Sequence, residues 1–174
     1  MNEIMNKTIH YIWLGHKSKL KIVKHCIASW KKHMPNWKIM EWNEENLNLD
    51  FCKYCRQAYD FKKFAFASDV LRFKILYEYG GLYFDTDVKL IKNIDHLCSK
   101  HNAFSCFEKK NVNPGLVLYS NKPKYKLFKD VLDVYLNTPF INQDNSLNLK
   151  VVGDYFTEIL IKYGYIVKNK LQTI

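Results

Sequence analysis

The chain has 174 residues, a length that suits a single domain able to bury a sizeable core. Hydrophobic residues make up 48% of the sequence and aromatic residues 16%, and this composition excludes a disordered chain. The formal net charge of +10 comes almost entirely from lysine, since only Arg56 and Arg72 are arginines. Proteins that read nucleic acid favour arginine. The charge therefore fits a solvated lysine-rich surface, or weak attraction to anionic lipid, better than a nucleic-acid interface.

The N-terminus and the cysteines bear on the compartment. The first residues include an acid and no long apolar run, so we expect neither a signal peptide nor a membrane span. Five cysteines without a signal peptide indicate a reducing compartment, so we expect a cytoplasmic protein, either free or peripheral at the inner face of the membrane. Cys52 and Cys55 form a CxxC pair that could bind zinc only with help from His96, Cys98 or His101. Two thiols on or near a helix is the simpler interpretation.

Hydrophobic periodicity predicts strands alternating with helices along the chain. Strands are expected at 8–14, 37–42, 82–84, 103–107 and 116–119, with 88–91 continuing the sheet edge. Helices are expected at 19–33, 51–59, 62–79, 124–136 and 154–162. Pro35 and the pair Gly80-Gly81 are stop signals for the first and third of these helices. The alternation predicts one domain with an α/β fold and a mainly parallel sheet.

Two aspartates separated by one residue, Asp85 and Asp87, follow the short apolar run 82–84. Residues i and i+2 of an extended chain point the same way, so both carboxylates can approach one ligand. Adjacent anions repel unless a cation lies between them, and Mg²⁺ or Mn²⁺ prefers oxygen ligands and bridges to phosphates. Ligands of open α/β sheets lie beyond the carboxyl ends of the strands, where Trp13 and Gly15 also fall. A solvated turn is the alternative interpretation of the two aspartates.

Asp69 and Arg72 are neighbours on the predicted helix because they are three residues apart. Their sequence surroundings are apolar, which favours a partly buried pair over an ordinary surface ion pair. Arg72 is the one guanidinium near the acidic turn and suits a phosphate. Trp13 can stack on a flat base, although a core tryptophan is the alternative.

Four stretches together carry a resemblance to a known family. They are IHYIWLG at 9–15, SW at 29–30, EWNEEN at 41–46 and AFASDVLRFKILYEYGGLYFDTDV at 65–88. They resemble glycosyltransferase family 32, the DXD-motif sugar transferases of the capsule and lipopolysaccharide type. The core is also similar to that of large bacterial glucosylating toxins. The resemblance covers most of residues 7–120.

The resemblance implies a GT-A nucleotide-diphospho-sugar transferase fold and a set of site residues. Asp69, Arg72, Asp85 and Asp87 would be catalytic, and Asp87 with Asp85 would hold Mn²⁺ or Mg²⁺. The nucleotide-sugar donor would be contacted by Ile12, Trp13, Phe64, Ser68, Asp69, Arg72, Tyr83, Asp85 and Asn113.

The implied function is metal-dependent transfer of a sugar from a nucleotide diphosphate donor to a glycan or lipid-linked glycan acceptor. Retention of configuration and a role in surface polysaccharide synthesis follow from the same resemblance. Family members usually continue to a closing segment with a His and a Ser-Trp pair, and this sequence ends at Ile174 without it. One alternative is therefore a weakly active or inactive nucleotide-sugar-binding remnant. A basic nucleic-acid-binding module is the second alternative.

Overall fold

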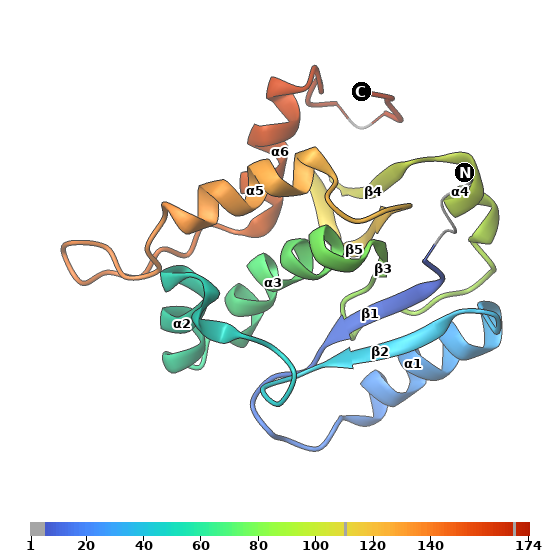
Figure 1. Cartoon of the computed structure of the whole chain (residues 1–174), viewed down its shortest axis with the longest axis horizontal. Helices are drawn as coiled ribbons and strands as arrows, with labels where there is room; N and C mark the ends of the chain where they lie inside the picture. The colour runs from blue at the N-terminus through green and yellow to red at the C-terminus, as the bar shows by residue number, and fades with distance from the viewer. Residues whose placement is uncertain (1–5, 110, 169) are drawn as a thin grey trace.

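The computed structural model describes residues 6–109, 111–168 and 170–174. One sheet holds five strands in the order β2-β1-β3-β5-β4 (Figure 1). The strands are β1 (Thr8–Ile12), β2 (Lys38–Trp42), β3 (Gly81–Tyr83), β4 (Ala103–Glu108) and β5 (Asn111–Ser120). β1 pairs in parallel with β2 and β3, whereas β5 pairs antiparallel with β3 and β4. The predicted α/β fold is confirmed, but the sheet is mixed because β4 and β5 are consecutive antiparallel strands.

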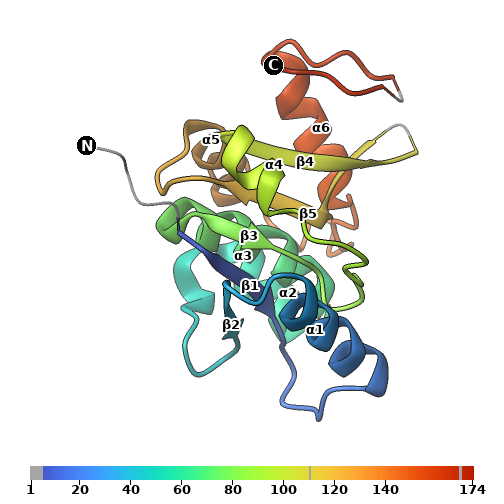
Figure 2. The same cartoon turned by 90° about the vertical axis from the view of Figure 1, so that its right-hand side faces the viewer.

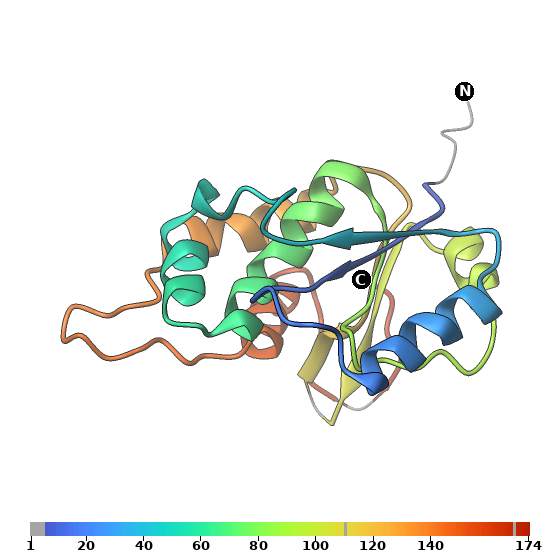
Figure 3. The same ribbon diagram turned by 90° about the horizontal axis from the view of Figure 1, so that it is seen from below.

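Helices cover both faces of this sheet (Figure 3). They are α1 (Lys21–His33), α2 (Lys53–Asp60), α3 (Phe64–Tyr79), α4 (Asp95–Lys100), α5 (Lys126–Leu136) and α6 (Val152–Lys162), with a 3-10 turn at Leu49–Phe51. α1 and α4 pack on one face, while α2, α3, α5 and α6 share the core on the other. α6 also packs against β5, where the Val112 amide donates to Thr157 Oγ1 at 3.1 Å (Figure 2).

The segment 88–91 is not a strand, so the expected continuation of the sheet edge is wrong. It runs beside α1, where Trp30 Nε1 donates to the Val88 carbonyl at 2.8 Å and the Leu90 amide donates to Ser29 Oγ at 2.9 Å. Burial of Leu90 against α1 accounts for the apolar pattern that had suggested a strand. α4 was not predicted, because six residues are too few to show a helical period. Among the described residues, no helix is long and apolar enough to cross a membrane.

The turn after α3 fixes β3 beside β1. Gly80 and Gly81 both have positive φ, and a Cβ at Gly81 would lie 2.6 Å from the Thr8 carbonyl oxygen. His10 secures the same junction, because its Nε2 lies 3.0 Å from the Gly80 carbonyl and its Nδ1 accepts from Trp42 Nε1 at 3.0 Å. The carboxyl ends of β1 and β3 therefore meet at one edge of the sheet.

All five cysteines are free thiols. Cys26, Cys52, Cys55 and Cys98 are buried and Cys106 on β4 is exposed. Cys52 caps α2 by accepting the Cys55 amide at 3.4 Å, and burial raises the pKa of both thiols. In the described part of the chain, no three His, Cys, Asp or Glu side chains gather in an arrangement that could hold a metal.

Candidate functional site

Arg72 lies at the centre of a buried charge cluster below the carboxyl end of β3. Its guanidinium is 3% exposed, and its Nη2 donates to Asp69 Oδ1 at 2.7 Å. Nη1 donates to Asp85 Oδ2 at 3.3 Å, and Nε donates to the Ser68 carbonyl at 3.3 Å. The guanidinium carbon also lies 5.0 Å from the centre of the Tyr83 ring. The structure thus brings together Ser68, Asp69, Arg72, Tyr83 and Asp85, five of the residues proposed for the site.

Asp85 is held from three sides. Tyr83 Oη donates to Asp85 Oδ1 at 2.8 Å, Arg72 contacts both carboxylate oxygens, and the Asp85 amide donates to the Gly115 carbonyl at 2.9 Å. A Cβ at Gly115 would lie 2.0 Å from Asp85 Oδ2 and 2.8 Å from Arg72 Nη1. The absence of a side chain at Gly115 therefore makes room for this ion pair.

Asn113 reaches the same place from β5. Its Oδ1 accepts the Gly115 amide at 2.8 Å, and its Nδ2 donates to Glu108 Oε2 at 2.6 Å. Asn113 therefore lies beside Gly115, next to the Asp85–Arg72 pair. Gly115 and Glu108 were missed. The NPG sequence at 113–115 was the available signal for Gly115, but the signal for Glu108 lies in the antiparallel pairing Glu108↔Asn111, which no sequence periodicity gives.

Asp87 differs from Asp85 because it is exposed and has no hydrogen bond or ion pair to a described residue. It lies in the turn that the Val88 amide closes by donating to the Asp85 carbonyl at 3.1 Å. Two carboxylates in one turn supply only oxygen ligands. Mg²⁺ commonly keeps several waters and binds through one or two carboxylates plus substrate phosphates, and Mn²⁺ also suits oxygen ligands. The residues present therefore fit such an ion, with Asp87 as the open ligand.

The charge state of Asp69 is set by its surroundings. Burial, together with the nearby Asp85 carboxylate, raises its pKa to about 6, and Arg72 opposes this shift. Burial lowers the pKa of Arg72, but Asp85, Tyr83 and Asp69 raise it more, so the guanidinium stays charged. Asp69 and Asp85 pair with one arginine, and the exposed Asp87 lies two residues further along the chain, so the carboxylates outnumber the positive charge and can attract a cation.

Two tyrosines that the sequence analysis did not single out lie near Asp69. Tyr54 and Tyr135 are buried with ring centroids 4.9 Å apart, and Asp69 raises the pKa of each after the larger effect of burial. Neither hydroxyl has a partner among the described residues. The aromatic wall behind Asp69 thus comes from α2 and α5, far from Asp69 in sequence.

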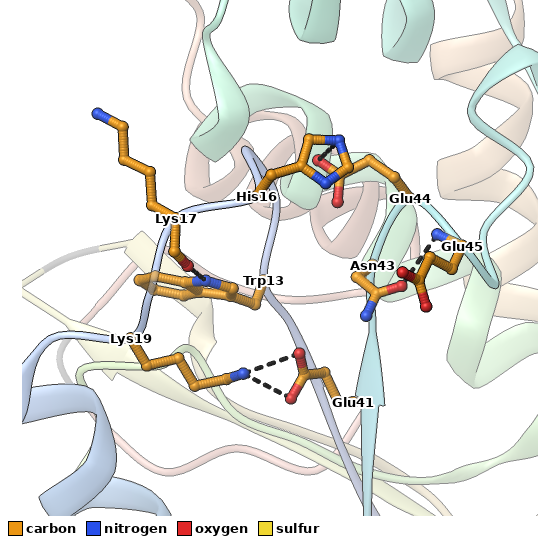
Figure 4. A pocket seen from close by; sticks show the side chains of 8 residues that line it. All are labelled: Trp13, His16, Lys17, Lys19, Glu41, Asn43, Glu44 and Glu45. Atoms are coloured by element: carbon orange, nitrogen blue, oxygen red, sulfur yellow. Dashed lines mark hydrogen bonds and ion pairs between the residues drawn. The ribbon is translucent and has the colours of Figure 1, made fainter.

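A second hollow lies at the end of β1 and has a volume of about 250 Å³ (Figure 4). It is lined by Trp13, His16, Lys17, Lys19, Glu41, Asn43, Glu44 and Glu45. Trp13 Nε1 donates to the Lys17 carbonyl at 2.6 Å, which fixes the indole at the pocket wall. Lys19 forms an ion pair with Glu41 at 2.7 Å and lies 6.0 Å from the Trp13 ring centre. Trp13 is half-buried, so part of its ring is accessible to a flat ligand.

Ile12 and Phe64 support this hollow without lining it. Ile12 is buried in the core, so its side chain lies behind the pocket wall. Phe64 begins α3 and packs on the Gly15 loop, since a Cβ at Gly15 would lie 2.6 Å from its ring. Arg72 is eight residues further along the same helix, or roughly 12 Å at 1.5 Å per residue. α3 therefore links the Trp13 pocket to the aspartate cluster.

Residues 21–104, just under half of the chain, match the family model described as "Glycosyltransferase sugar-binding region containing DXD motif". Among solved structures, the chain is similar to "PaToxG Glycosyltransferase" with a TM-score of 0.68 and 19% identity, over 91% of this chain and 69% of that chain. A search of curated proteins finds no match. The fold is thus that of a glycosyltransferase, and residues 21–104 correspond to a DXD-containing sugar-binding region.

Proposed function

We propose that this protein is a glycosyltransferase that moves a sugar from a nucleotide diphosphate donor to a glycan or lipid-linked glycan acceptor. The observation that carries the proposal is the DXD turn itself. Asp85 is fixed from the protein side by Arg72 and Tyr83, while Asp87 remains open to solvent. A solvated surface turn would not need one aspartate anchored to a buried arginine, so this asymmetry favours a ligand site.

Each residue has a task in this proposal. Trp13 stacks on the base, and Ser68 with Asp69 contacts the ribose or the sugar. Arg72 holds the sugar and diphosphate with its planar fork, and Asp85 accepts hydrogen bonds from ribose or sugar hydroxyls. Tyr83, at the carboxyl end of β3, contacts a phosphate, and Asn113 lies at the sugar or the acceptor.

Asp87, with Asp85, would hold Mn²⁺ or Mg²⁺ together with the diphosphate of the donor. When bound, such an ion neutralises the charge that develops on a departing diphosphate. With the cation bound, the repulsion between the carboxylates of Asp85 and Asp87 is neutralised, so their proximity is no longer unfavourable.

The resemblance to family 32 supports three finer parts of the proposal. These are retention of anomeric configuration, a role in capsular polysaccharide or lipopolysaccharide synthesis, and peripheral contact with the cytoplasmic face of a membrane. The alternative of a nucleotide-sugar-binding remnant predicts donor binding without turnover. Measuring donor hydrolysis and transfer with Mn²⁺ separates the two. The alternative of a nucleic-acid-binding module predicts a salt-dependent gel shift and no nucleotide-sugar binding.

The proposal is tested by the variant Asp87→Asn in a thermal-shift assay with nucleotide diphosphates, with and without Mn²⁺. An amide oxygen is a poorer ligand than a carboxylate, so the variant should lose the metal-dependent part of the shift. Any transfer activity should fall by orders of magnitude. Without ligands, the melting temperature should be unchanged or slightly higher, because one of two repelling carboxylates is gone.

Asp144→Asn is the matched control, since Asp144 is an exposed aspartate in the loop before α6. It should keep the full metal-dependent shift. An Asp87→Asn protein with the wild-type shift would show that this aspartate does not bind the metal.

A further inference from the structure

The acidic residues are distributed unevenly along the chain. No aspartate or glutamate occurs between Glu3 and Glu41, although this stretch contains Lys7, Lys17, Lys19, Lys21, Lys24, Lys31, Lys32 and Lys38. α1 lies inside this stretch and buries Val23, Cys26, Ser29 and Trp30. Its opposite side presents Lys21, Lys24, Lys31 and Lys32, all exposed. We call these four lysines the α1 basic face.

The α1 basic face differs from the lysine-bearing sides of α3 and α5. On α5, Lys126 pairs with Asp130 at 2.8 Å, and Lys129 pairs with Asp133 across one helical turn. Lys74 on α3 pairs with Glu78 in the same way. Within the described part of the chain, no ion pair joins the lysines of the α1 basic face to an acid, whereas Lys7 and Lys19 outside the helix pair with Asp95 and Glu41.

The beginning of α1 is the second feature. Lys21 and Lys24 stand in the first turn, where the helix dipole favours anions and disfavours cations, and no side chain caps the helix. This arrangement is unfavourable in water and becomes favourable when an external anion lies against it. α5 also begins with two lysines and no cap, but Asp130 and Asp133 pair with its lysines.

Large apolar side chains are exposed next to these lysines. Leu20, at the N-cap of α1, is 64% exposed, and Ile22 is 56% exposed. Ile91 is 75% exposed on the segment that is hydrogen-bonded along α1, where Asn93 Nδ2 donates to the His33 carbonyl at 2.8 Å. Aliphatic side chains among unpaired lysines suit the boundary between lipid head groups and acyl chains.

We infer that α1 docks on an anionic membrane surface, with its basic face against the head groups and Leu20, Ile22 and Ile91 inserted among them. The inference specifies the membrane contact within the proposed function, but lipid binding can be measured without any sugar transfer. Lysine, not arginine, supplies the charge, and no aromatic side chain belongs to this surface. These features favour a lipid surface over nucleic acid, whose bases need stacking or bidentate partners.

Docking in this way has a consequence for the site. The segment that carries Ile91 begins one residue after Asp87, and the Trp13 pocket lies just before α1 along the chain, with Lys17 and Lys19 in its lining. A membrane-bound acceptor would therefore meet the proposed donor site at the surface on which α1 rests.

The test is co-sedimentation of the full chain with vesicles made of equal parts phosphatidylglycerol and phosphatidylcholine, and with vesicles of phosphatidylcholine alone. The wild type should bind the mixed vesicles, and added salt should weaken this binding. Lys21→Gln with Lys24→Gln should reduce the affinity by about tenfold or more. Leu20→Ser with Ile22→Ser should also reduce it, and this pair leaves the charge intact.

Lys126→Gln with Lys129→Gln is the matched control, because it removes the same charge from exposed, acid-paired lysines on α5. It should leave vesicle binding within about twofold of the wild type, since its lysines already have partners. An equal loss in the control would overturn the inference in favour of net charge alone. Absence of binding to mixed vesicles would also overturn the inference. So would binding of the protein to a DNA duplex that is weakened by the same substitutions as vesicle binding. Circular dichroism checks that each variant is folded. The Lys21→Gln/Lys24→Gln protein should still bind nucleotide diphosphates, so a loss of vesicle binding alone does not contradict the proposed function.

Discussion

At the scale of single residues, Arg72 connects Asp69 with Asp85 in the candidate site. It carries a buried positive charge between Asp69 and Asp85, and leaving either carboxylate buried without a partner would be costly. Its five N–H groups lie in one plane, which a lysine ammonium cannot reproduce. The shape of this side chain should therefore matter as much as its charge.

We expect Arg72→Lys to lose donor binding and activity although the charge is retained. Hydrogen bonds to charged partners contribute about 1.5–3 kcal/mol each, so the loss of one corresponds to roughly tenfold to hundredfold in kcat/KM. Steady-state kinetics measures the effect. Arg56→Lys is the control, because Arg56 is an exposed arginine that pairs with Asp50 at 2.6 Å. Full activity of Arg72→Lys would show that the ion pair of Arg72 with Asp69 has only a structural role.

Gly115 permits a second prediction at this scale. Gly115→Ala places a methyl group 2.0 Å from Asp85 Oδ2, so the carboxylate must move away from Arg72. Overpacking typically costs about 1–3 kcal/mol of stability, and the metal-dependent thermal shift should be lost as well. In the control Gly153→Ala, the new Cβ meets nothing nearer than the Val112 carbonyl oxygen at 3.3 Å, so the shift should persist. A normal shift in Gly115→Ala would mean that the position of Asp85 is unimportant for the ligand.

At the scale of elements, α1 has an N-terminus without a side-chain cap and carries exposed side chains. Leu20 has the extended backbone of an N-cap residue, with φ −61 and ψ 157, but a side chain that cannot accept a hydrogen bond. Leu20→Asp should therefore raise the free energy of unfolding by about 1 kcal/mol in urea denaturation. The same variant should weaken binding to anionic vesicles, because it adds an anion and removes an apolar side chain.

Val151→Asp provides the comparison for this prediction. Val151 is the uncapped N-cap residue of α6, with φ −77 and ψ 154, and it is 50% exposed. An aspartate there should give a similar gain in stability without changing vesicle binding. If both variants changed vesicle binding alike, the effect would come from net charge and not from α1.

Elements with a strong local pattern could be predicted from the sequence, and those set by distant contacts could not. β1, β2, α1 and α3 begin and end within about two residues of their expected bounds, because apolar spacing and the stop at Gly80 are local. The segment 88–91 was misassigned because its apolar residues face α1, which is far away in the chain. Apolar spacing cannot distinguish a helix surface from a sheet edge as the partner of such a segment.

The candidate site divides in the same way. Asp69 and Arg72 could be paired from helical spacing, and Asp85 and Asp87 from their place after a strand. The contacts of Gly115 and Glu108 with this group depend on the antiparallel register Tyr83↔Leu118 and Glu108↔Asn111. The aromatic wall at Asp69 depends on how α2 and α5 pack over α3. Neither the strand register nor the helix packing can be predicted from a local sequence pattern.

At the scale of the whole molecule, two buried groups should give opposing pH dependences of stability. Burial lowers the pKa of His10 from 6.5 to about 4. The unfolded state therefore binds more protons in this range, and the contribution of His10 is full above pH 6.5 and lost as the pH falls toward 4. Its full extent is about 3 kcal/mol. Asp69 has its pKa raised from 3.8 to about 6, so its contribution is present below pH 3.8 and lost as the pH rises through 6.

The two contributions partly cancel between pH 4 and 6, so we expect His10 and Asp69 together to change the stability of the wild type little across this window. Asp69→Asn should expose the histidine effect, and its free energy of unfolding should fall clearly between pH 6.5 and 4.5. His10→Gln should show the opposite slope. Urea denaturation at several pH values measures both variants. Parallel curves for the wild type and both variants would contradict this assignment.

The distribution of thiols makes the protein convenient for spectroscopy. Four of the five cysteines are enclosed by the core, so a maleimide dye applied to the native protein should react at Cys106 alone. Cys106 stands opposite Asn113 in the register of β4 and β5. A fluorophore attached there would be one strand away from the aspartate cluster, on the unmutated chain. Binding of a nucleotide sugar could then be followed directly as a change in emission.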